Sequence, residues 1–446
     1  MIERLMKWMD ESTCNFMAAK TIAGELDNAG FMRLDACEKW NLEKGGKYYV
    51  MKNGSAVFAF ILGMMSPAET GFRIIASHSD SPCFKLKPNA EIYGEGGVVS
   101  LNVEKYGGGI LYTWFDRPLS IAGRVMTRGL DALHPTTRLV DLKRAVCTIP
   151  HLAIHFNREV NEGNKLSVQK DMKPVIGIFS EEEIEDYKKH GGVVKCIIAK
   201  QLGIQPEEII DYELNLYPIM PAQLVGVNNE FLQCGRIDDL SMAFASLEAM
   251  LQESRHDATA TRVMAVFDNE ETGSGTKQGA HSPVLRTILE RICSQKIWNE
   301  CLAPARVEYE EDGDEFYRAI ANSFMISADD AHAWHPNYND KYDPTNHPVI
   351  GGGPVVKINA NCKYMTDADG AAVFRSLCAD AGVNCQYFVN HSDVAGGSTL
   401  GNILTGQLDL RGVDMGAAIW AMHSAAECAG VSDHEDTVAV FREFYK

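Results

Sequence analysis

Carboxylates and imidazoles recur where short apolar stretches of the sequence end. The side chains that are candidates for chemistry are His78, Asp80, Asp238, Glu270, Glu271, Asp329 and His423. Glu270 and Glu271 follow the apolar stretch Arg262–Phe267, and two carboxylates that leave one strand toward the same edge repel each other. Three or more carboxylates that converge at about 4 Å would repel by several kcal/mol even at an effective dielectric constant near 20. Divalent cations would remove that repulsion.

Carboxylates and imidazoles without thiolates suit zinc, cobalt or manganese. A carboxylate that bridges two ions is the usual organiser of a two-metal hydrolytic site. Taken singly, each of these residues is more typical of a cap or of a satisfied polar group. The residue types therefore favour a metal-dependent hydrolase and leave a structural role open for any one of them.

Several other chemistries lack their motifs. The sequence has no G-x-G-x-x-G after a strand, no G-x-x-x-x-G-K-[ST], no G-x-S-x-G and no H-E-x-x-H, which weakens dinucleotide, nucleotide, serine-hydrolase and zincin interpretations. The twelve cysteines contain no C-x-x-C pair and predict reduced thiols, not a disulfide framework or a zinc finger.

Composition narrows the class of partner. The 446 residues carry 42 basic and 60 acidic side chains, a formal charge of -18, which argues against nucleic acid and anionic membrane surfaces. No apolar stretch reaches the roughly 18 to 20 residues of a membrane helix, and the amino terminus has the spacing of an amphipathic helix and not of a secretory signal. We expect a cytoplasmic protein without nucleic-acid or membrane partners.

The elements that must position the candidate residues alternate between strands and helices. After Gln223 the apolar pattern predicts a helix over Ser241–Leu251 and strands over Arg262–Phe267 and Phe324–Ser327. Such alternation predicts a largely parallel sheet, whose ligand-binding edge is where the strands finish. Between about Lys85 and Leu224, short strands separated by glycines predict a small β-rich unit.

The chain resembles the aspartyl aminopeptidase family of dinuclear zinc exopeptidases nearly end to end. The resemblance is carried by the segments SHSDSPCFKLKP, YGGGILYTWFDRPLSIAGRV, IPHLAIHFNREV, GRIDDL, FDNEETGSGTKQGA, ISADDAHAWHPNY, GGPVVKINANCKY, GGSTLGNI and VDMGAAIWAMHSAAE. It implies an α/β fold in which residues 1–85 and 225–446 form a three-layer α/β/α zinc-exopeptidase (phosphorylase/hydrolase-like) catalytic domain. Residues 86–224 would form an inserted β-rich domain for oligomerisation and substrate access.

The same resemblance assigns the metal ligands. It implies one ion held by His78 and Asp329 and a second held by Glu271 and His423. Asp238 would bridge both ions, which are expected to be zinc, with cobalt or manganese as other choices. The family also commonly has a cis peptide bond after the bridging Asp, here between Asp238 and Asp239.

Catalytic and substrate roles follow in the same way. The resemblance implies that Glu270 is the general base and that Asp80 orients the imidazole of His78. Substrate contacts are implied for His155, His332, Lys357 and Tyr364. Of these, Lys357 would attract an acidic side chain, and His155 would reach the active site of a neighbouring subunit.

Some positions depart from the family pattern. The first helix begins with Ser12-Thr13-Cys14-Asn15-Phe16-Met17, of which only Phe16 matches, and Asp330 and Trp334 are unusual. These departures make acidic specificity less secure than peptidase chemistry. The histidines His134, His190 and His256 lie outside the matching blocks and are expected at the surface.

The predicted function is release of one amino-terminal residue, preferably Asp or Glu, from short peptides. The resemblance implies a homo-oligomer, typically a tetrahedral dodecamer. Two alternatives remain open: a dinuclear aminopeptidase or deacylase with neutral substrate preference, and a catalytically silent assembly protein. The complete set of ligands with Glu270 argues against the silent protein.

Overall fold

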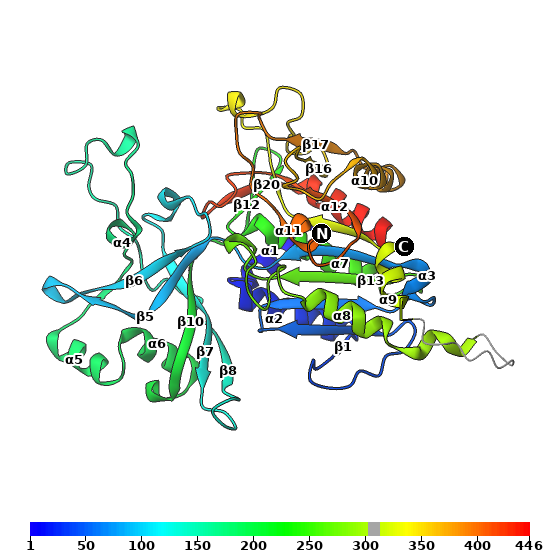
Figure 1. Cartoon of the computed structure of the whole chain (residues 1–446). Coiled ribbons are helices and arrows are strands. Elements are labelled where there is room, and N and C mark those ends of the chain that lie inside the picture. The colour runs from blue at the N-terminus through cyan, green and yellow to red at the C-terminus, as the bar shows by residue number, and fades with distance from the viewer. Residues whose placement is uncertain (302–312) are drawn as a thin grey trace.

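A nine-stranded mixed sheet organises the larger part of the molecule (Figure 1). The computed structural model describes residues 1–301 and 313–446. In spatial order the strands are β1 (Met32–Arg33), β2 (Lys47–Lys52), β3 (Ala56–Ile61), β13 (Thr261–Phe267), β4 (Phe72–His78), β14 (Phe324–Ala328), β18 (Arg411–Gly416), β16 (Val355–Ile358) and β17 (Gln386–Val389). The neighbours β13, β4, β14 and β18 are parallel, so their carboxyl ends meet at one edge.

Both faces of this sheet are buried, because successive side chains along a strand point to opposite faces. On β13, Met264 and Val266 pack into one apolar cluster, and Val263, Ala265 and Phe267 pack into another. The first cluster is completed by α1 (Ile2–Glu11), α2 (Asn15–Asn28), α7 (Ile237–Glu253), α10 (Ala368–Asp380) and α12 (Val431–Tyr445). The second is completed by α8 (Val284–Cys293), α9 (Glu315–Ala321) and α11 (Leu400–Leu404), with α3 (Pro67–Thr70) beside α9. The result is a three-layer α/β/α arrangement, and the predicted α/β fold is confirmed.

A second sheet stands to one side of the first (left in Figure 1). Its strands are antiparallel and run in the order β8 (Thr136–Asp141), β7 (Leu119–Thr127), β10 (Ile209–Pro218), β5 (Cys83–Tyr93), β6 (Val98–Tyr106) and β9 (Val175–Ile178). The helices α4 (Val168–Asp171), α5 (Glu181–Lys189) and α6 (Val193–Leu202) accompany it. We propose that this sheet with its helices is the inserted domain expected at residues 86–224, and we call it the insert; its own apolar cluster supports this division.

A small third sheet combines strands from three separate parts of the chain. It consists of β11 (Gln223–Val225), β12 (Phe231–Cys234), β20 (Glu427–Gly430), β19 (Ala418–Trp420) and β15 (Ala331–His332). This sheet joins segments that lie close to candidate site residues, since β12 leads into α7 and His423 lies between β19 and β20. No helix among the described residues is long and apolar enough to cross a lipid bilayer.

Other sequence-based expectations hold at residue level. The amphipathic helix expected at the amino terminus is α1, the predicted helix Ser241–Leu251 lies within α7, and the predicted strands Arg262–Phe267 and Phe324–Ser327 are β13 and β14. The cysteines whose side chains are described are all free thiols. His134, His190 and His256 are exposed, as expected.

A buried histidine in this fold makes stability depend on pH. His434 on α12 is 4% exposed, lies 5.6 Å from the ring of Phe244, and has no hydrogen-bond partner for either ring nitrogen among the described groups. Burial, assisted by the positive amino terminus, lowers the pKa of His434 to about 4 from an ordinary value of 6.5. The folded chain therefore binds a proton less readily than the unfolded chain, and stability should fall as pH drops from about 6.5 toward 4, by up to about 3 kcal/mol.

His434→Leu should remove this part of the pH dependence, because a neutral side chain of similar size has no proton to gain. The urea midpoint of the variant, followed from pH 7 to pH 4.5, should decline less than that of the wild type. His256→Leu, at an exposed histidine, is the matched control and should follow the wild type. Parallel curves for His434→Leu and the wild type would contradict the assignment.

Candidate metal centre

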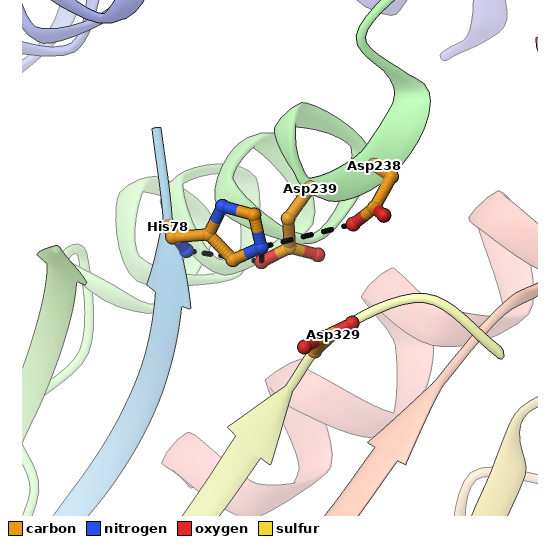
Figure 2. Close-up of side chains that lie close together, drawn as sticks. All are labelled: His78, Asp238, Asp239 and Asp329. Atoms are coloured by element: carbon orange, nitrogen blue, oxygen red, sulfur yellow. Dashed lines mark hydrogen bonds and ion pairs between the residues drawn. The ribbon is translucent and has the colours of Figure 1, made fainter. Parts of the chain in front are cut away.

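Three neighbouring parallel strands deliver the predicted residues to one edge of the large sheet. His78 is the last residue of β4, Glu270 and Glu271 follow β13, and Asp329 follows β14. Asp238 arrives from the start of α7, which faces the same edge (Figure 2). Residues far apart in the sequence therefore meet because the strands that carry them are adjacent.

The first of two clusters contains His78, Asp238, Asp239 and Asp329, all buried (Figure 2). Each can offer one ligand atom, and these atoms all lie within 4.8 Å of one another. The Nε2 atom of His78 lies 3.7 Å from Oδ1 of Asp238. The peptide bond between Asp238 and Asp239 is cis, as the family resemblance implies.

The second cluster contains Asp238, Glu271 and His423. The Nε2 atom of His423 lies 3.4 Å from Oδ2 of Asp238 and 3.3 Å from Oε2 of Glu271. Asp238 thus presents Oδ1 to the imidazole of one cluster and Oδ2 to the imidazole of the other. This is the arrangement that a carboxylate bridging two cations requires.

Several buried atoms of the two clusters have no hydrogen-bond partner among the described groups. They are Nε2 of His78, Oδ1 of Asp238, Oδ1 of Asp239 and Oε1 of Glu271. Buried polar atoms in folded proteins nearly always have a partner. Imidazole nitrogens and carboxylate oxygens are ligands that zinc accepts, so the donor set fits a divalent metal.

The electrostatics of the clusters favour the same conclusion. Burial, together with the charges of Asp329 and Asp80, raises the pKa of Glu270 to about 8 against the effect of His78. Burial and the charge of Asp238 raise the pKa of Glu271 well above its ordinary value. Burial would also raise the pKa of Asp238, but a hydrogen bond with His423 and the charge of His78 hold it below its ordinary value. Bound cations would favour the ionised form of every carboxylate here.

Asp80 was predicted to orient the imidazole of His78, and its carboxylate also contacts the backbone of the glutamates that follow β13. The Nδ1 atom of His78 lies 3.0 Å from the main-chain oxygen of Asp80 and 3.4 Å from its Oδ1. The carboxylate of Asp80 accepts hydrogen bonds from the main-chain nitrogens of Glu270, at 3.1 Å, and Glu271, at 3.2 Å. Asp80 thus contacts the imidazole of one cluster and the backbone that carries both glutamates.

The sequence did not single out Glu427 or Asp239 as site residues. The buried Glu427 accepts hydrogen bonds from the main-chain nitrogens of Asp238, at 3.1 Å, and His423, at 2.6 Å. Oδ2 of Asp239 accepts from the main-chain nitrogen of His78 at 3.0 Å. The sequence contained one feature that could have identified them, which is that both lie near candidate residues. Asp239 adjoins Asp238, and Glu427 ends the block that contains His423.

A pocket of about 410 Å³ opens beside the clusters, and three of the four predicted substrate-binding residues line it: His332, Lys357 and Tyr364. Lys357 is 3% exposed; its Nζ atom lies 3.3 Å from Oδ1 of Asp329 and donates to the main-chain oxygen of Asp330 at 2.9 Å. The side chain of Asp330, one of the unusual positions, is buried and accepts from the hydroxyl of Ser241 at 2.7 Å. Lys357 therefore already has acidic and carbonyl partners within the chain.

The fourth predicted substrate-binding residue, His155, lies elsewhere. It is exposed in a loop of the insert and does not line this pocket. Its predicted role involves a neighbouring subunit and stays a prediction.

Known proteins resemble this chain over its full length. A family model described as Aminopeptidase I zinc metalloprotease (M18) matches residues 8–445. A probable M18 family aminopeptidase 2 of Clostridium novyi is 44% identical over 441 residues, which cover 99% of this chain and 97% of that protein.

Solved structures show the same similarity. Ape4, determined in a complex with Nbr1, has a TM-score of 0.92 at 33% identity, with 99% of this chain and 84% of that chain covered. The mApe1 dodecamer of S. cerevisiae has a TM-score of 0.82 at 26% identity, with 99% and 95% covered.

Zinc should stabilise the folded chain, because a cation that binds only the folded state raises the free energy of unfolding, by about 2.7 kcal/mol at 100 times its Kd. Glu271→Gln should reduce this effect, since it removes a carboxylate of the second cluster. Without metal, its thermal midpoint should equal or exceed that of the wild type, because a glutamine at this position has no charged form for burial and Asp238 to disfavour. Thermal unfolding with chelator and with added zinc measures both quantities.

The control for this experiment is Glu185→Gln, which replaces an exposed glutamate on α5. It should keep the full zinc-induced rise in midpoint. An equal rise in Glu271→Gln and in the wild type would remove Glu271 from the metal centre.

Proposed function

The chain belongs to the M18 family of zinc metallo-aminopeptidases, and we propose that it uses two divalent cations to release single amino-terminal residues, preferably Asp or Glu, from short peptides. The observation that carries the two-metal part of the proposal is the pair of clusters that share Asp238. One ion would be held by His78 and Asp329, the other by Glu271 and His423, with Asp238 as the bridge. Zinc is the proposed metal, and cobalt or manganese would suit the same ligands.

When bound, the cations would lower the pKa of a water molecule and polarise the carbonyl of the scissile peptide bond. The residues around them would position the reactants. Glu270 belongs to neither ligand cluster, lines the pocket, and has Oε2 at 3.9 Å from Nε2 of His78. In our proposal its carboxylate accepts a proton from the attacking water and gives it to the leaving amine.

The amino-terminal end of the substrate needs a partner for its positive charge. The carboxylates of Asp329 and Glu270 border the pocket, and one or the other would supply that partner. His332 on β15 also borders the pocket and is proposed to help stabilise negative charge on the carbonyl oxygen. Asp80 would not contact the substrate; its carboxylate would hold the backbone of Glu270 and Glu271 through hydrogen bonds.

Acidic specificity rests on Lys357, which is proposed to attract the carboxylate of the first substrate residue, next to Tyr364. The ring of Tyr364 lies 5.6 Å from the Lys357 ammonium. One observation favours the alternative of a neutral preference: Lys357 already contacts Asp329 and the carbonyl of Asp330. Apolar side chains of Phe388, Ile403 and Met422 also line the pocket.

Oligomerisation is part of the proposal. The mApe1 relative is a dodecamer, and we propose a homo-oligomer of the same kind for this chain, in which His155 reaches a neighbouring active site. The insert exposes several large apolar side chains, which suits contacts between subunits: Leu130, Leu133, Leu152, Ile154 and Phe156. A cytoplasmic location remains the prediction made from the sequence.

Glu270→Gln should retain both metals and lower kcat by about 10²- to 10⁴-fold, because a glutamine amide cannot accept the proton. Elemental analysis of the purified variant measures bound metal, and steady-state hydrolysis of an aspartyl peptide measures kcat. Glu290→Gln, at the exposed surface of α8, serves as the control. Full activity in Glu270→Gln would exclude Glu270 as the base.

Lys357→Met should lower kcat/KM for Asp- and Glu-terminated peptides at least about tenfold more than for Leu- and Ala-terminated peptides. The physical reason is the loss of a hydrogen bond between charged groups, worth about 1.5 to 3 kcal/mol. The wild type should also cleave Asp-terminated peptides faster than Leu-terminated ones. An equal loss of kcat/KM on all four peptides would show that Lys357 interacts with Asp329 and not with the substrate side chain. Faster cleavage of Leu-terminated than of Asp-terminated peptides by the wild type would support the alternative of a neutral substrate preference.

A further inference from the structure

The insert reaches the metal centre through the end of β6. Tyr106 is the last residue of this strand and is followed by Gly107-Gly108-Gly109. The main-chain nitrogen of Ile110 donates to the main-chain oxygen of His423 at 3.0 Å. A strand of the insert therefore ends directly against a candidate ligand of the second cluster.

The glycines allow this close approach. A Cβ atom at Gly108 would lie 3.2 Å from Nδ1 of His423, and a Cβ atom at Gly107 would lie 3.2 Å from Cβ of Glu271. The main-chain oxygen of Gly108 lies 3.4 Å from Nδ1 of His423. A proton held on Nδ1 toward this oxygen leaves Nε2 free to face Asp238 and Glu271.

The hydroxyl of Tyr106 acts on the other ligand of the second cluster through Asp80. It donates to Oδ2 of Asp80 at 2.5 Å and accepts from Nδ2 of Asn269 at 2.8 Å. Oδ2 of Asp80 also accepts from the main-chain nitrogen of Glu271. The hydroxyl thus fixes the carboxylate that holds the backbone of Glu271, whereas the shorter contact of His78 is between its Nδ1 atom and the main-chain oxygen of Asp80, at 3.0 Å.

Asn269 connects the Tyr106 hydroxyl to the backbone of Glu270 and Glu271 in a second way. It adopts a left-handed conformation with φ of 63°, which is uncommon for residues other than glycine. Its side chain is held by Tyr106, by Thr276 and by Gln278. Loss of the Tyr106 hydroxyl would loosen the residue from which Glu270 and Glu271 continue.

We propose that Tyr106 and Gly108 of the insert are positioning residues for the cation site formed by Asp238, Glu271 and His423. This inference rests on the proposed two-metal function and deepens it. Tyr106 acts on Glu271 through Asp80, and Gly108 acts on the imidazole of His423. The insert thereby sets the affinity of one of the two cation sites more than that of the other.

Tyr106→Phe tests the hydroxyl on the full-length chain. Removal of a group that orients a ligand typically weakens metal binding about 10- to 100-fold. We expect zinc titration by calorimetry, with a competing chelator, to show this loss at one of two sites and little change at the other. The matched control is Tyr212→Phe, because the Tyr212 hydroxyl donates only within the insert, to the main-chain oxygens of Lys87 and Pro88.

Zinc affinity separates a positioning role from a purely structural one. If Tyr106 only ties the two sheets together, Tyr106→Phe and Tyr212→Phe will lower the thermal midpoint of the metal-free chain and leave both zinc affinities at the wild-type values. That result would overturn the proposal. Equal weakening at both sites would overturn its claim for the second site.

Gly108→Ala tests the same site independently, and it decides the matter if Tyr106→Phe does not fold. Its added methyl group would press on Nδ1 of His423 and should weaken zinc binding at one site. Gly109→Ala is the control, since its methyl group would meet Cβ of Pro82 at an ordinary 3.5 Å. Zinc binding by Gly108→Ala that equals that of Gly109→Ala would contradict the proposal. A wild-type chain that binds fewer than two zinc ions would refute the two-metal function itself, which is a different result.

Discussion

Mutual repulsion among buried carboxylates is the constraint on which the rest of this structure depends. Asp238, Asp239, Glu271 and Asp329 lie in two clusters that share Asp238, and burial raises the pKa of Glu271 and Asp239 well above their ordinary values. A folded chain tolerates such a group of acids only when the acids are protonated or when cations lie between them. Neutral acids would be poor ligands, so the arrangement is useful to a hydrolase in its metal-bound form. Two further acids, Asp80 and Glu427, accept hydrogen bonds from main-chain nitrogens of Glu270, Glu271, Asp238 and His423, and so hold the backbone that carries the clusters.

The large sheet explains how such distant residues come to share one place. The parallel neighbours β13, β4 and β14 end at the same edge, and each is followed within three residues by a candidate site residue or ends in one. Their interiors are apolar on both faces, so the strands cannot slip without exposing the core. Register at the centre of the sheet therefore fixes the positions of His78 and Asp329. The glutamates after β13 lie farther from the strand end, and their backbone needs the contacts of Asp80 and Asn269 as well.

The sequence alone was sufficient to predict those site residues whose positions follow from the local pattern of apolar and polar residues. His78 and Asp329 directly follow or end buried apolar strands, so a parallel sheet was enough to predict that they meet. The roles of Asp238 and His423 came from the family resemblance, since nothing in their local pattern places them at the sheet edge. Glu427 and Tyr106 were missed because their function lies in hydrogen bonds between distant segments, such as the one between Glu427 and Asp238, which are 189 positions apart. A glutamate at the start of a strand and a tyrosine at the end of one are indistinguishable from ordinary surface residues until the fold brings their partners together.

The two proposed cation sites differ in how much of their geometry the large sheet supplies. The first contains His78, whose side chain is 1% exposed, and Asp329, which is paired with the buried ammonium of Lys357. Its ligands stand at strand ends, and part of its negative charge is already balanced by the chain. The second contains His423, whose side chain is 30% exposed, on a loop between two short strands of the third sheet, with φ of 68°. Because the main-chain nitrogen of His423 donates to Glu427 and its main-chain oxygen accepts from Ile110, just after the glycines that follow β6, the second site depends on segments outside the large sheet. A change in how the insert packs against the large sheet would therefore act on His423 directly, through Gly108, and on the backbone of Glu271 through Tyr106 and Asp80.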